Sequence, residues 1–96
     1  MVLSLDEVKA HLRIETNDED LELASMISKS QARAEEFCRV TFPDGDDAPE
    51  TVRLAVLLMT SYLYENRDAP DHTAYVTMRT AFENLLYPHR DPALMF

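Results

Sequence analysis

The chain has 96 residues, 46% of them hydrophobic, and its 18 acidic and nine basic side chains give a formal net charge of −9. The length predicts one domain over residues 1–96 with a modest core, and the apolar content excludes wholesale disorder. The negative charge argues against binding to nucleic-acid phosphates or to an anionic membrane, since both kinds of binding require clusters of Lys and Arg.

The first predicted element is a short helix over residues 5–12. Ser4 and Glu7 have the spacing of a capping box, in which each side chain accepts a hydrogen bond from the backbone of the other residue. Leu5, Val8 and Leu12 then share one helical face.

A long amphipathic helix is predicted over residues 19–40. Its apolar residues recur at intervals of three and four: Leu23, Met26, Ile27, Ala34, Phe37 and Cys38. Ser30 is expected to fill a gap in this stripe, and Leu21 and Ala24 are expected to widen it. Lys29 and Arg33 lie on the outer face, where we expect solvent.

Residues 49–67 are predicted to form the central helix. Pro49 suits a first helical turn, while Glu50 and Arg67 complement the two ends of the helix dipole. Residues 54–59 are apolar without a break, so we expect protein on every side of this helix. The run is far shorter than the roughly 20 residues that span a bilayer.

The last helix is predicted over residues 74–86, after a connector that contains Pro70. Pro88 ends it and begins a tail without regular structure. No stretch alternates at the two-residue period of a strand. The predicted fold is therefore an all-α bundle of about four helices (5–12, 19–40, 49–67 and 74–86) around a buried central helix.

No residue set predicts catalysis. The sequence has no nucleophile elbow, zinc-protease motif or phosphate-binding Gly loop, and its three histidines lie in separate segments. Cys38 is the only cysteine, which is typical of a small buried apolar residue. Acidic residues gather at 16–20 and 44–47, where capping and turns explain them and the spacing of an EF-hand is missing. We expect no enzyme, no catalytic residue, no cofactor and no metal.

Sequence-specific DNA binding is weakly supported. A helix-turn-helix protein needs a basic recognition helix. The largest basic cluster along this sequence is Lys9, His11 and Arg13, which is too small.

Three segments together resemble a known family. They are residues 3–14 followed by the acidic residues 18–20, residues 49–67, and residues 85–90. In this order and spacing they resemble the small head–tail connector proteins of tailed phages and prophages, a family also described as possible DNA-packaging proteins. The third segment has His89 where the family more commonly has Tyr. The resemblance covers nearly the whole chain.

The resemblance implies a non-catalytic, all-helical subunit of the virion. It implies a homo-oligomeric ring of about a dozen copies at the head–tail junction, below the portal protein. Such a ring extends the DNA channel, lets DNA pass without specific contacts, and offers a platform to tail-completion proteins. No membrane is implied, and the subunit is expected in the host cytoplasm during assembly. The alternative is a small DNA-binding or dimeric interaction module of phage or prophage origin.

Two assembly contacts are hypothesised. The first joins the end of the central helix of one copy to the mixed-charge face of the second helix, because Tyr and Arg are common interface anchors. Its residues are Tyr64, Glu65, Asn66 and Arg67 together with Lys29 and Arg33. The second is docking of an apolar terminal segment on the portal or a neighbouring copy, through Leu94, Met95 and Phe96.

Overall fold

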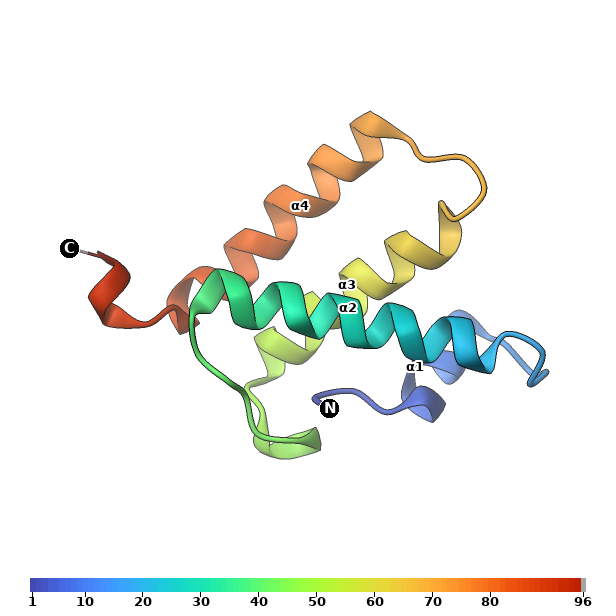
Figure 1. Cartoon of the computed structure of the whole chain (residues 1–96), viewed down its shortest axis with the longest axis horizontal. Helices are drawn as coiled ribbons and strands as arrows, with labels where there is room; N and C mark the ends of the chain where they lie inside the picture. The colour runs from blue at the N-terminus through green and yellow to red at the C-terminus, as the bar shows by residue number, and fades with distance from the viewer. Residues whose placement is uncertain (96) are drawn as a thin grey trace.

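The computed structural model describes residues 1–95, which are all-α (Figure 1). The helices in this range are α1 (Leu5–Leu12), α2 (Asp20–Cys38), α3 (Glu50–Glu65) and α4 (His72–Leu86). Three short 3-10 turns accompany them: η1 (Gly45–Asp47), η2 (Tyr87–His89) and η3 (Pro92–Met95). The predicted fold class is confirmed.

The helix ends follow local capping. The Ser4–Glu7 capping box forms as predicted, and α1 has its predicted bounds. Helix α2 ends two residues before the predicted position, because Arg39 adopts a left-handed φ of 59° and donates its N–H to the Glu35 carbonyl. Helix α4 begins two residues before its predicted start, because the Asp71 side chain accepts a hydrogen bond from the Ala74 N–H and caps it.

Helix α3 is the centre of the fold. It packs against both α2 and α4, whereas α2 and α4 have little contact with each other. These two outer helices meet near their C-terminal ends, where the Cys38 thiol donates to the Leu86 carbonyl at 3.5 Å. From that point they diverge, and α3 lies between and behind them (Figure 1).

The core combines residues from all four helices. Its fully buried side chains include Val8, Leu23, Val52 and Leu86. One polar contact lies inside it: Thr60 Oγ1 on α3 is 3.1 Å from Ser30 Oγ on α2, and both residues are completely buried. The prediction that Ser30 fills a gap in the apolar stripe is confirmed.

Three burial predictions are wrong. Leu54 is 50% exposed, Leu21 is 90% exposed and Ala24 is also exposed, although the sequence predicts that all three face the protein interior. The molecule is thin, with extents of 45 × 31 × 17 Å, and the side of α3 that carries Leu54 is left partly uncovered. Leu21 lies on the outer side of the first turn of α2, where no neighbouring helix reaches it.

Candidate assembly surface

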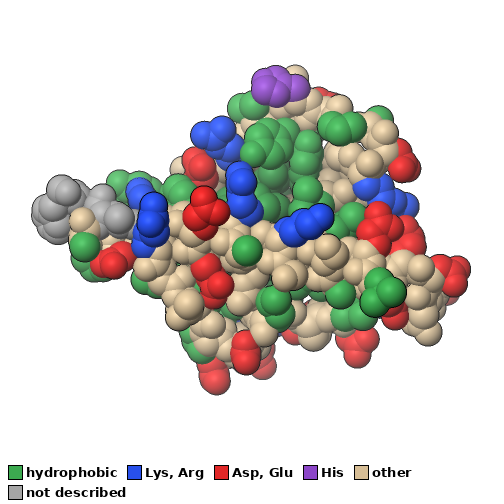
Figure 2. Space-filling view, viewed as in Figure 1, with side chains coloured by type: hydrophobic (Ala, Val, Ile, Leu, Met, Phe, Trp, Pro, Cys, Tyr) green, Lys and Arg blue, Asp and Glu red, His purple; other side chains and the backbone are tan. Residues whose placement is uncertain are grey.

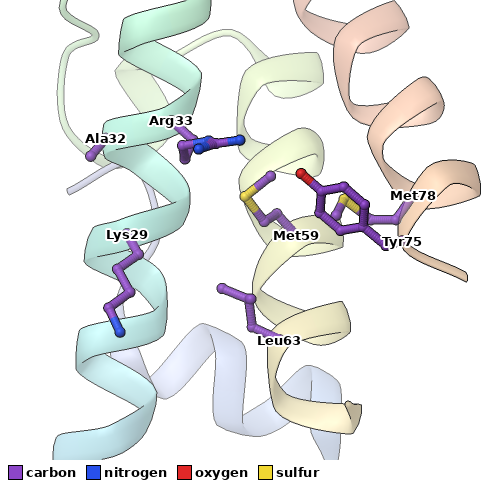
Figure 3. Close-up of a pocket in the computed structure, with 7 residues that line it drawn as sticks. All are labelled: Lys29, Ala32, Arg33, Met59, Leu63, Tyr75 and Met78. Carbon is purple, nitrogen blue, oxygen red and sulfur yellow. The ribbon is translucent and has the colours of Figure 1, made fainter. Parts of the chain in front are cut away.

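A groove of about 440 Å³ opens where α2 and α4 diverge (Figure 3). We call it the α2–α4 groove. Its floor is apolar and comes from α3 and α4: Met59, Leu63, Tyr75 and Met78. Its lip comes from α2 and consists of Lys29, Ala32 and Arg33. Figure 2 shows this arrangement as a hydrophobic hollow bordered by Lys and Arg side chains.

Lys29 and Arg33 are exposed on the lip of this groove. Within residues 1–95 neither forms an ion pair. Arg33 points from α2 toward Met59 (Figure 3). Two cations beside an apolar floor form a surface that suits an apolar segment carrying a carboxylate.

The basic side chains continue past the groove. A polar hollow between α2 and α4 brings Arg33 together with Arg39, Arg79 and Arg90. Arg90 is held there by stacking on Phe37, with its guanidinium carbon 4.7 Å from the ring centroid. We call Lys29, Arg33, Arg39, Arg79 and Arg90 the basic face; it holds five of the nine basic residues. This cluster could not be predicted from the sequence, because Arg79 and Arg90 are far along the chain from the other three residues.

The C-terminal end of α3 is occupied by contacts within the subunit. Tyr64 Oη donates to Glu19 Oε1 at 2.8 Å, and the Arg67 guanidinium pairs with Glu19 Oε2 at 3.0 Å. The same guanidinium lies 4.1 Å from the centroid of the Tyr64 ring. The hydrogen bond to the Glu19 carboxylate raises the pKa of Tyr64 above its ordinary value. The structure thus places Tyr64 and Arg67 against the start of α2, away from Lys29 and Arg33 of the same copy.

The neighbouring residues of that hypothesis lie differently. Asn66 Nδ2 donates to the Tyr62 carbonyl at 2.9 Å and helps to close the helix. Glu65 is exposed and forms no ion pair among the described residues. Glu65 is therefore the member of the set with a charge to offer to another chain.

The far side of α3 carries a second apolar surface. We call it the α3 ridge and define it as Leu54, Leu57, Leu58, Ser61 and Glu65. Leu54 is half exposed, and Leu57, Leu58 and Ser61 are only partly buried. Shallow hollows flank the ridge on the α1 side and on the α4 side. The Ser61 Oγ has no hydrogen-bond partner in the described structure.

Comparison with protein families decides what kind of protein this is. The family model for the phage gp6-like head-tail connector protein matches residues 2–90. The chain belongs to this family. It is thus a structural protein of a phage, with a connector role and a place in the virion. No curated protein and no solved structure is significantly similar to it.

The C-terminal segment of the connector leaves the bundle beside the end of α2. The Asp91 N–H donates to the Cys38 carbonyl at 2.8 Å, and the following turn projects away from the helices (Figure 1). The side chains of Leu94 and Met95 and the whole of Phe96 lie outside the described residues, so the predicted docking contact stays a prediction.

Among residues 1–95, no three His, Cys, Asp or Glu side chains lie close enough together to hold a metal ion. In the same range, no helix combines the length and apolar character that crossing a bilayer requires. Burial raises the pKa of the Cys38 thiol, and the nearby Arg90 offsets part of this effect.

Proposed function

We propose that the connector assembles into a closed ring of about a dozen copies that binds below the portal protein. The family match over residues 2–90 carries this proposal. The subunit has two unlike surfaces, a cation-lined groove and an exposed ridge, which is what head-to-tail association needs. The ring would extend the DNA channel and present a platform to tail-completion proteins.

DNA would pass through this ring without specific contacts. The chain carries twice as many acidic as basic residues, so a lumen lined by acids would repel the phosphate backbone and let DNA slide. Assembly would take place in the host cytoplasm before the virion is complete. The basic face is the strongest argument for DNA binding instead, but Glu36 and Glu83 lie within it.

The subunit contact is proposed to join the end of α3 to the lip of the groove on the next copy. Its residues are Tyr64, Glu65, Asn66 and Arg67 on one copy and Lys29 and Arg33 on the other. Replacement of Arg67 with Glu places a third carboxylate beside Glu19 and Glu22, so it should loosen the end of α3 and impair rings. Light scattering measures assembly and circular dichroism checks helicity. Assembly like that of the unaltered chain would count against the contact.

The terminal segment is proposed to dock on the portal or on a neighbouring copy. Deletion of residues 93–96 removes the apolar end but keeps Asp91 and its hydrogen bond to Cys38. Portal binding should fall while helicity is unchanged. Equal binding by the shortened and the full chain would remove the proposed contact.

The ring itself is tested by negative-stain imaging of the purified connector, with and without the portal protein of the same virus. Rings in either sample support the proposal. Particles that stop at two copies would support a dimeric module, and a duplex-DNA shift that weakens steeply with salt would support a DNA-binding protein.

A further inference from the structure

The α2–α4 groove and the α3 ridge lie on opposite sides of one helix. Residues 54, 58, 61 and 65 recur at intervals of three and four and therefore share one side of α3. Met59 and Leu63 form part of the groove floor and share the other side, about half a turn around the helix. One copy therefore cannot place its own ridge in its own groove.

The two surfaces match in chemistry. The groove offers an apolar floor with Lys29 and Arg33 on its lip, two cations that form no ion pair within residues 1–95. The ridge offers leucines that are exposed or partly exposed, followed by Glu65, a carboxylate without an ion pair among the described residues. Contact between them would bury apolar surface on both sides and would give each charge an opposite partner.

We propose that the α2–α4 groove receives the α3 ridge of a second copy, with Leu58 over the floor and Glu65 beside Lys29 and Arg33. This inference rests on the proposed ring and names the surfaces that build it. The contact is heterologous, because each copy uses one surface to give and a different one to receive. Every copy in a closed ring then has both surfaces covered. Glu65 supplies the charge in this contact, while the Arg67 guanidinium stays paired with Glu19 of its own subunit.

Cysteine cross-linking tests the contact directly. Leu58→Cys and Arg33→Cys are made as separate variants and mixed with a short bismaleimide. The mixture should give covalent dimers, and the chain carrying both substitutions should give a ladder of oligomers. Cys38 is fully buried, so the unaltered chain is a control that should not react. A second control uses Glu15→Cys in place of Arg33→Cys, because residue 15 is exposed in the loop between α1 and α2. This mixture should give no dimer.

Charge reversal tests the same contact without a reagent. Glu65→Lys alone, and Lys29→Glu with Arg33→Glu in another chain, should each raise the concentration needed for assembly about tenfold or more. A mixture of the two chains should assemble again, because each altered surface then meets its complement. Glu15→Lys is the control, with assembly unchanged.

The outcomes separate the two proposals. Two results would overturn the groove–ridge contact: a charge-reversed chain that forms rings normally, or cysteine variants that form rings but give no cross-link. Either result would leave the proposed function standing. A connector that forms no ring with or without the portal would overturn both. Cross-linking together with recovery in the mixture would establish the contact.

Discussion

The contact between Ser30 and Thr60 joins α2 to α3 inside the core. Ser30 follows Lys29 of the groove lip in the sequence, and Thr60 follows Met59 of the groove floor. Both residues are completely buried, and Thr60 Oγ1 also bonds to the Val56 carbonyl at 2.8 Å. This pair therefore helps to hold the lip of the groove beside its floor.

Removing one partner should cost more than removing both. Thr60→Val keeps the shape but leaves the Ser30 hydroxyl without its partner across the helices, which should lower the free energy of unfolding by about 1–3 kcal/mol. Ser30→Ala should cost less, about 0.5–1.5 kcal/mol, because Thr60 retains its bond to Val56. In the chain with both substitutions, neither position carries a hydroxyl that has lost its partner.

Urea unfolding followed by circular dichroism measures the three variants against the unaltered chain. We expect the double variant to be more stable than the sum of the single effects by roughly 0.5–3 kcal/mol. Strictly additive losses would contradict this expectation, because they would mean that the two hydroxyls do not depend on each other.

Three further predictions concern single sites. Ser4→Ala removes the cap of α1 and should lower stability by about 1 kcal/mol in thermal unfolding; no change would contradict the cap's role. The hydrogen bond from the Ser4 backbone N–H lowers the pKa of Glu7. The stabilising effect of ionised Glu7 should therefore be full above the ordinary pKa of glutamate and should fade as the pH falls through the lowered value. Melting curves taken across acid pH measure this change. Cys38 is buried with a raised pKa, so a thiol reagent should modify the native chain far more slowly than the urea-unfolded chain; equal rates would show that the thiol is accessible.

Features that depend on neighbouring residues along the chain could be predicted from the sequence. Features that depend on how the helices pack in layers could not. The capping box at Ser4 and Glu7 is local, and it forms as expected. The apolar run in α3 predicts an enclosed helix, but Leu54 is half exposed. The run does not indicate how many layers cover the helix, so this exposure could not be predicted.

The assembly surfaces show the same limit. Lys29 and Arg33 could be singled out on a helical face, but only the divergence of α2 and α4 places an apolar floor beside them. The grouping of Arg39, Arg79 and Arg90 depends on tertiary structure alone. Arg67 stands out in the sequence because it lies at the end of a predicted helix. Its contact with Glu19 could not be predicted, because that contact depends on where α2 begins in space.

A cryo-electron microscopy map of the connector bound to its portal would show the subunit contacts themselves. We expect a closed ring in which Lys29 and Arg33 of each copy face Leu58 and Glu65 of the next. A ring whose groove lies open to solvent, or a connector that binds the portal as separate single copies, would contradict it.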